Sequence, residues 1–281
     1  NLGWNESLNK DLSYGVSFLG TYNKNEMVEM GAESQVITGG TIHGGTYTSR
    51  TLAGYPIGGF WLIPTDGYFN STEEVQAHQK DGVLIQPSAE PGDIRFKDTN
   101  NDGTINDEDR VYCGSPFPKF TYSINGNITY KNVDFSIGFQ GVTGNKIYNA
   151  TKLELTDVTR GTNYLASTLD YWTPENQNAS SPRLIWTDPN RNARSESDRY
   201  LESGSYFRLR NLQVSYTLPT VWFHGFVQKA RVYVNAENLF TISSYSGYTP
   251  DVNSSDVYSR GFDEFIYPSN RTFMFGLNVT F

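Results

Sequence analysis

Apolar and polar side chains alternate along several short stretches, most plainly at the end of the chain. From Arg271 onward every second residue is apolar, and the residues between are mostly small or polar. A period of two predicts a β-strand with one apolar face. A last strand that ends on an aromatic residue is typical of the closing strand of an outer-membrane barrel, although an edge strand of a soluble all-β domain would alternate in the same way. The apolar positions are Phe273, Phe275, Leu277, Val279 and Phe281.

The same alternation predicts further strands, and neighbouring ones pair as hairpins. The clearest hairpin turns at Lys131-Asn132, between two runs in which aromatic and β-branched residues recur at every second position. The predicted strands cover residues 1–8, 12–22, 120–130, 133–141, 212–218, 232–236 and 271–281.

The connections between these strands alternate between short and long. The short ones are residues 9–11, 131–132 and 219–228, and the long ones are 23–118, 143–203 and 244–269. Outer-membrane barrels have short periplasmic turns and long extracellular loops on opposite rims, whereas such long loops are uncommon in compact soluble domains. We therefore predict an all-β fold, a transmembrane antiparallel β-barrel, in which 24–118 and 143–203 are long extracellular loops.

Composition agrees with this prediction and narrows the function. Only 37% of residues are hydrophobic while 15% are aromatic, as expected when one face of each strand is polar and aromatic residues lie at the membrane interfaces. No apolar run approaches the roughly 18 residues of a membrane helix. The net charge of −8 argues against nucleic acid as a partner, and a single cysteine excludes an internal disulfide. With no signal peptide and fewer strands than the about eight of the smallest closed barrel, the chain is expected to be part of a larger protein.

One local motif, residues 98–109, predicts a metal site. Its oxygen-bearing residues occupy positions 1, 3, 5, 7, 9 and 12 of a calcium loop, and Gly103 lies at position 6, where the loop turns sharply. Position 12 is Asp rather than the longer Glu, and an Asx-rich turn without an ion is the alternative. We expect a structural Ca²⁺ here. The expected ligands are Asp98, Asn100, Asp102, Thr104, Asn106 and Asp109.

Catalytic chemistry is not expected. His43, His78 and His224 lie far apart in the sequence, and none has the context of a catalytic or zinc motif. We predict that the protein is not an enzyme. Aromatic residues of the long connections could stack on sugar rings, although packing between loops or a place in the interface belt explains them equally well. These candidates are Trp61, Tyr148, Trp172 and Trp186.

Several longer stretches resemble the C-terminal part of SusC/RagA-family TonB-dependent outer-membrane transporters of Bacteroidetes. The resemblance runs in series along most of residues 54–281 and includes the Phe281 terminus. The stretches are Pro91–Asp98, Phe120–Gly126, Phe135–Asn145, Tyr171–Asn176, Ser197–Asn211, Tyr216–Pro219, Arg231–Phe240 and Tyr245–Pro250.

The resemblance implies a large plugged barrel of about 22 strands in the bacterial outer membrane. It implies import of glycans or peptides, energised through TonB by way of an N-terminal part, and a SusD-like surface lipoprotein that lids the barrel. Two alternatives stay open at this point. A secreted, calcium-stabilised β-sandwich that binds carbohydrate would explain the calcium motif and the aromatic residues, and a passive porin would share the loop pattern.

Overall fold

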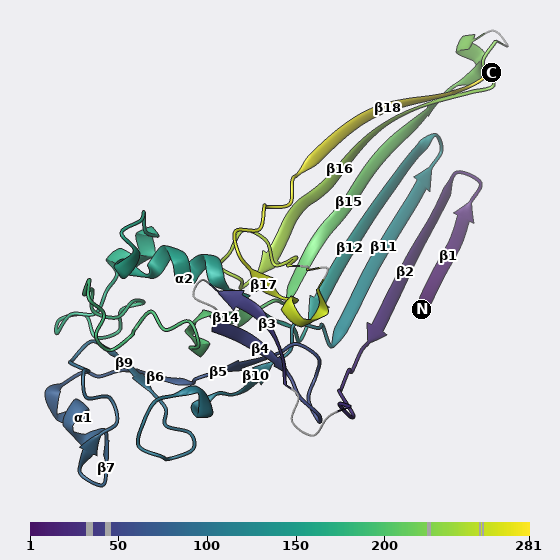
Figure 1. The fold of residues 1–281 in the computed structure, drawn as a ribbon. Coiled ribbons are helices and arrows are strands. Elements are labelled where there is room, and N and C mark those ends of the chain that lie inside the picture. The colour runs from purple at the N-terminus through teal and green to yellow at the C-terminus, as the bar shows by residue number, and fades with distance from the viewer. Residues whose placement is uncertain (32–35, 43–45, 224–225, 253, 255) are drawn as a thin grey trace.

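The computed structural model describes residues 1–281 except 32–35, 43–45, 224–225, 253 and 255. Within the described residues, seven long strands form one sheet in the order β1-β2-β11-β12-β15-β16-β18, and all neighbours are antiparallel (Figure 1). All seven strands predicted from the alternating pattern are confirmed. Their bounds are β1 (Leu2–Asn9), β2 (Leu12–Tyr22), β11 (Phe120–Tyr130), β12 (Val133–Thr143), β15 (Tyr206–Leu218), β16 (Lys229–Ser243) and β18 (Thr272–Thr280).

The register of the pairing gives the sheet one apolar face and one polar face. A row of directly opposed residues crosses six strands from Tyr14 to Phe275, and every member is aromatic or aliphatic. The next row crosses the same strands and is formed mainly by glycine, serine and amides, because neighbouring residues on a strand point to opposite faces. The apolar row is Tyr14, Ile128, Phe135, Val214, Val234 and Phe275, and the next row is Gly15, Asn127, Ser136, Gln213, Asn235 and Met274.

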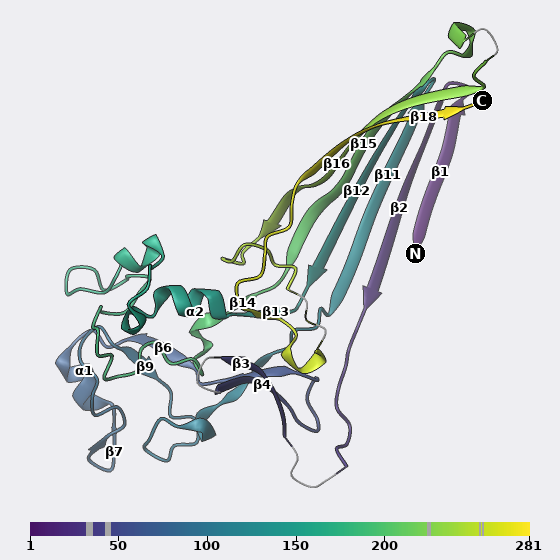
Figure 2. The same cartoon turned by 45° about the horizontal axis from the view of Figure 1, so that its top comes forward.

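The connections of the sheet sort by length onto its two ends. The turns after β1, β11 and β15 lie at one end, while the long connections after β2, β12 and β16 gather at the other (Figures 1 and 2). We call residues 23–119, 144–205 and 244–271 the loop layer. The loop layer lies beyond one end of the sheet rather than against either of its faces (Figure 2). This is not the arrangement of the β-sandwich alternative, in which two sheets pack face to face.

The loop layer contains more regular structure than the sequence indicates. Its largest sheet has the order β10-β5-β4-β3, and a smaller one has the order β14-β13-β17. These strands are two to six residues long, and several are buried on both sides, so they show no alternation that a sequence could reveal. The elements are β3 (Ile37–Ile42), β4 (Thr46–Thr51), β5 (Gly59–Leu62), β6 (Thr65–Tyr68), α1 (Thr72–Ala77), β7 (Gln79–Lys80), β8 (Val83–Leu84), β9 (Ile94–Phe96), β10 (Val111–Gly114), β13 (Lys146–Asn149), α2 (Ala150–Thr156), β14 (Leu201–Ser203) and β17 (Phe262–Asp263).

The loop layer has a core of its own, drawn from all three long connections. Phe60 and Leu62 pack with Tyr148 and Tyr200, and Phe262 stacks on Tyr148 with ring centroids 5.6 Å apart. Across the described part of the chain, no helix is long and apolar enough to cross a membrane.

A buried polar network also joins the first long connection to the second. The carboxylate of Asp93, fully buried, accepts hydrogen bonds from Nε and Nη2 of Arg183 at 2.6 and 2.9 Å. It also accepts one from the amide of Asn192 at 2.8 Å. The backbone N–H of Glu90 is a fourth donor, at 2.9 Å, so both oxygens of this buried charge are hydrogen-bonded twice.

Candidate functional site

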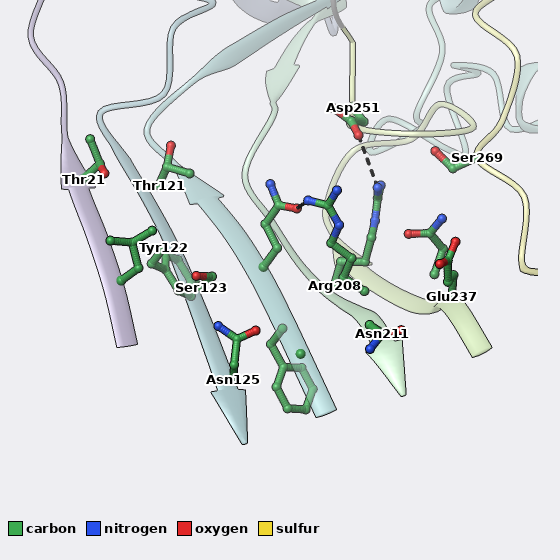
Figure 3. A pocket seen from close by; sticks show the side chains of 16 residues that line it. Thr21, Thr121, Tyr122, Ser123, Asn125, Arg208, Asn211, Glu237, Asp251 and Ser269 are labelled. Carbon is green, nitrogen blue, oxygen red and sulfur yellow. Dashed lines mark hydrogen bonds and ion pairs between the residues drawn. The ribbon is translucent and has the colours of Figure 1, made fainter. Parts of the chain in front are cut away.

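The polar face of the sheet contains a cavity of about 780 Å³ near the loop layer. Its walls come from β2, β11, β12, β15 and β16, with Asp251 and Ser269 reaching in from the last long connection (Figure 3). Figure 3 shows side chains of Thr121, Ser123 and Asn125 along one strand, facing Arg208 and Glu237 across the hollow. The lining is thus mainly polar, and it holds side chains of both charges.

An irregularity in β15 shapes this cavity. Leu209 pairs with Phe139 on one neighbouring strand and Asn211 pairs with Gly138, the residue just before it, so Arg210 is an extra residue. The pairing with β16 shifts at the same place, between Phe240 and Glu237. Such a bulge re-aims side chains and is frequent next to functional sites. Here it gathers Arg208, Arg210 and Asn211 at one cavity, where a regular strand would place at most two of three residues on the same face.

The two arginines of the bulge differ in how their charges are matched. The side chain of Arg208 is 8% exposed, and its Nη1 lies 3.2 Å from a carboxylate oxygen of Asp251. Its Nε donates to the hydroxyl of Thr241 at 2.9 Å, and its guanidinium lies 4.9 Å from the ring centroid of Tyr206. Arg208 is therefore a fixed, neutralised group.

Arg210 is exposed, and its partner in the described structure is a neutral amide. Its Nη1 donates to Oε1 of Gln140 at 2.6 Å. Its Nε and Nη2 have no hydrogen-bond partner among the described residues. Glu237, paired with Asn211 across the strands, likewise meets an amide, with Nδ2 of Asn235 at 3.4 Å from Oε1. Within the described residues, a cation and an anion that have only amide partners thus border one cavity.

The six predicted calcium ligands lie in one loop, residues 98–109, within the loop layer. Asp98 accepts hydrogen bonds from the backbone of Asp102 and Gly103 at 3.1 and 2.7 Å. Gly103 has φ of +92°, which only glycine adopts without strain, so the sharp turn expected at this position is present. The Asp109 carboxylate, fully buried, accepts from the backbone of Thr99 at 2.7 Å and of Asn106 at 2.8 Å.

This loop could hold a cation only if the side-chain amides of Asn100 and Asn106 turned over. Asp102 accepts hydrogen bonds from the amide nitrogens of Asn100 and Asn106 at 2.9 and 3.0 Å, and from the backbone of Thr104. The hydrogen bond from Asn100, followed by those from Thr104, lowers the pKa of Asp102 to about 2. No group of three or more acidic, histidine or cysteine side chains within metal-binding reach occurs among the described residues. The two amides would have to turn their oxygens inward to coordinate Ca²⁺, which takes oxygen ligands.

The four aromatic candidates lie apart and in different settings. Tyr148 is fully buried and donates from its hydroxyl to the backbone carbonyl of Ser195 at 2.6 Å. Trp172 is 6% exposed and donates from Nε1 to Asn70. Neither residue offers an open ring face, because loop packing covers both. This is the setting in which such residues hold loops together.

The other two aromatic candidates are more accessible. Trp61 is half-buried in a cluster with Tyr55 and Tyr112, at centroid distances of 4.8 and 5.9 Å. Trp186 is 63% exposed, and its ring lies close enough to Gly161 that a Cβ there would approach it to 3.0 Å. A role in stacking on a ligand stays a prediction for these two residues.

The alternating residues of the last strand lie on the apolar face. Val279, Leu277, Phe275 and Phe273 oppose Ala230, Val232, Val234 and Ala236 of β16. Their exposure reaches 80% at Phe275, and Phe281, just beyond the strand, is 81% exposed. Side chains this apolar and this open need a hydrophobic environment to cover them.

The remaining titratable residues do not assemble into a reactive group in the described structure. His78 is partly buried beside Phe69, and burial lowers its pKa. Burial has the opposite effect on the thiol of Cys113: it raises the pKa, because it disfavours the charged thiolate, and this makes the thiol a poor nucleophile. His43 and His224 lie outside the described residues.

The charged residues of the cavity were not among the sequence candidates. The alternating pattern predicted this strand only from Leu212, because the bulge breaks the period at Arg208, Leu209 and Arg210. A signal was present in the run Arg208-Leu-Arg-Asn211, which places two arginines and an asparagine within four residues just before a clear strand.

Comparison with known proteins gives a consistent set of relatives, although no family model matches the chain. TonB-dependent receptor P3 of Formosa agariphila is 31% identical, over 97% of this chain and 27% of the receptor. TonB-dependent receptor P26 of the same organism is 30% identical, over 100% and 29%. TonB-dependent receptor SusC of Bacteroides thetaiotaomicron is 25% identical, over 97% and 25%. The chain thus spans between a quarter and three tenths of these curated relatives.

Solved structures agree on the fold. The structure of the RagAB peptide transporter matches with a TM-score of 0.76 over 99% of this chain and 28% of that chain, at 19% identity. The RagAB peptide importer in its open-open state matches with a TM-score of 0.73. The curated relatives are named as receptors, which agrees with the prediction that the protein is not an enzyme.

Proposed function

The chain is SusC/RagA-like over nearly its whole length, and from that premise we propose that it forms part of the wall of a TonB-dependent outer-membrane importer. The observation that carries the proposal is the division of the sheet into two faces. The apolar face matches a lipid environment, and the polar face matches a water-filled or plugged interior. In this arrangement the loop layer lies outside the cell and the short turns lie at the periplasmic end.

The imported solute is a polar oligomer, a glycan or a peptide. The cavity on the polar face offers hydroxyl, amide and charged side chains to such a solute, at the level where the strands meet the loop layer. Energy comes through TonB by way of a part of the protein outside these residues. A SusD-like surface lipoprotein covers the loop layer, which supplies a broad, folded platform at the rim (Figure 1).

A passive porin is the competing function, since its wall would have the same two faces. The experiment that separates the two is uptake by intact cells that express the native protein containing this chain. We expect uptake of oligosaccharides or oligopeptides to stop when TonB is deleted or the proton gradient is dissipated. Uptake that continues unchanged under either condition would favour the passive porin over the TonB-dependent importer.

A second experiment tests the assembly. The native protein is purified in detergent from the outer membrane, and its mass and its co-purifying proteins are determined. We expect a mass well above that of 281 residues and a stoichiometric lipoprotein. A protein of only this length that occurs outside the outer membrane would contradict the proposal.

We also propose that the loop at residues 98–109 holds a structural Ca²⁺. The order of its donor residues and the turn at Gly103 support this role. The ion would draw the oxygens of Asp98, Asn100 and Asp102 together and stiffen the loop. It would have no part in the chemistry of transport.

A further inference from the structure

The cavity on the polar face is bordered by charged residues from two neighbouring strands, β15 and β16. Arg210 extends toward Gln140 of β12, and Glu237 projects from β16. Arg208 lies between them and is already neutralised by Asp251. Among the described residues, the wall therefore presents a cation without an ion-pair partner and a closed ion pair on β15, and an anion without an ion-pair partner on the neighbouring β16.

The separation of the two free charges sets a length for the ligand. The guanidinium of Arg210 lies beside Gln140 on β12, whereas Glu237 lies on β16 in the row of Gly138, two residues along. Two strand spacings of about 4.8 Å and an offset of about 6.6 Å along the strands place the two charges about 12 Å apart. An extended peptide advances about 3.3–3.6 Å per residue, so about three to four residues span this distance. The wall matches a zwitterion of that size.

The aromatic residues that border the cavity do not serve as sugar platforms. Tyr122 and Phe139 belong to the apolar face, where both rings stack on Phe207 at centroid distances of 6.3 and 5.1 Å. An acidic glycan carries charge of one sign, and Glu237 would repel its carboxylates. The observed pair of opposite charges therefore favours a peptide over a neutral glycan, which carries no charge, and over an acidic glycan, which carries only negative charge.

We propose that this cavity binds short extended peptides, with Arg210 holding a carboxylate and Glu237 holding an ammonium group. The proposal rests on the import function above and names the substrate class of that same wall. The guanidinium of Arg210 can present two parallel N–H groups to a carboxylate, the geometry in which arginine binds most strongly. Gly138 opposite the bulge adds no side chain, and a Cβ there would approach Oδ1 of Asn125 to 3.1 Å. This leaves room for the peptide backbone.

The test is calorimetric binding to the native, detergent-solubilised protein that contains this chain. The probes are Ala-Ala-Ala, its C-terminal amide, its N-acetyl form and a uronic acid trimer. We expect Arg210→Gln to weaken Ala-Ala-Ala roughly tenfold or more and to leave the C-terminal amide unchanged. Glu237→Gln should weaken Ala-Ala-Ala and leave the N-acetyl form unchanged. Arg210→Lys should restore part of the loss.

A charge-matched control is Arg231→Gln. Arg231 lies on the same wall, at the end of the sheet with the short turns, and is ion-paired with Asp134 at 3.0 Å. It should leave the affinity for all four probes unchanged. If Arg210→Gln weakened the acid and the amide equally, or changed neither, the carboxylate assignment would be overturned.

The remaining outcomes separate this inference from the import function. Failure of the wild-type protein to bind Ala-Ala-Ala would overturn the peptide assignment, and binding of the uronic acid trimer that Arg210→Gln abolishes would replace it with an acidic glycan. In both cases TonB-dependent uptake of another solute would leave the import function standing. Absence of any TonB-dependent uptake would instead contradict the import function itself.

Discussion

The sheet and the loop layer bury their side chains in different ways. On the apolar face of the sheet, Val214 is 45% and Phe275 80% exposed, whereas Tyr148 and Phe60 in the loop layer are fully buried. The apolar side chains of the sheet are exposed in this structure and need a surrounding medium to cover them. Those of the loop layer are covered by other residues of the loop layer. One chain thus contains a part whose stability depends on its surroundings and a part whose stability depends on internal contacts. The two parts should respond to different perturbations.

The largest expected effect is in the loop layer, at Asp93. Asp93→Ala leaves the partly buried charge of Arg183 without its main partner and removes an acceptor for Asn192. Breaking a buried, hydrogen-bonded ion pair in this way costs about 3–5 kcal/mol. Hydrogen exchange should report this loss in the opening free energy of amides near 86–96 and 183–194, while the strands of the sheet keep their protection.

Glu90→Ala is the matched control for this prediction. Glu90 pairs with the same arginine, but its side chain is 67% exposed, so its loss should cost less than about 1 kcal/mol. Equal losses in the two variants would mean that burial does not set the strength of these contacts. The contrast between the two regions would then lose its physical basis.

The second prediction tests the sheet at two neighbouring positions of β15. Val214 lies on the apolar face between Phe135 and Val234, and Gln213 lies on the polar face between Ser136 and Asn235. In a lipid bilayer Val214→Arg should cost about 2–4 kcal/mol if the position lies near the midplane, because the charge would face hydrocarbon. Gln213→Arg should cost much less. The folded fraction of the native protein, reconstituted in vesicles and titrated with urea, measures both.

This pair also decides whether lipid covers the apolar face. If both variants were destabilised equally, the two faces would see the same environment. The apolar row from Tyr14 to Phe275 would then be covered by protein. The loop layer should remain unaffected in either case.

The same difference explains what the sequence could predict. Strands with one apolar and one polar face leave a period of two, so the runs around Ile128, Phe135 and Phe275 identified the sheet, its turns and its faces. The short strands of the loop layer, such as Gly59–Leu62, are buried on both sides and leave no period. The bulge at Arg210 interrupts the period of its own strand, so the charged cavity could be found only once strands distant in sequence were placed side by side.

The third prediction concerns the loop at residues 98–109. If Ca²⁺ binds there, a concentration about 100-fold above its dissociation constant should stabilise the loop by roughly 2.7 kcal/mol. Proteolysis within the loop should slow accordingly on addition of Ca²⁺ and recover with a chelator. Asp98→Ala combined with Asp102→Ala should abolish the response. Protease sensitivity that stays the same with and without chelator would show that no Ca²⁺ stabilises this loop.

The smallest expected effect is a pH dependence of that loop, which the sheet should not share. Hydrogen bonds from Asn100 and Thr104 lower the pKa of Asp102 from 3.8 to about 2. Because the folded pKa lies below the unfolded one, the ionised carboxylate stabilises the loop above about pH 4, and this contribution is lost as the pH falls toward about 2. Cleavage of the loop by pepsin, measured without Ca²⁺, should therefore accelerate between these values. Asp102→Asn should remove the step, since its side chain does not titrate. A step that persists in this variant would show that Asp102 is not the source of the acid sensitivity.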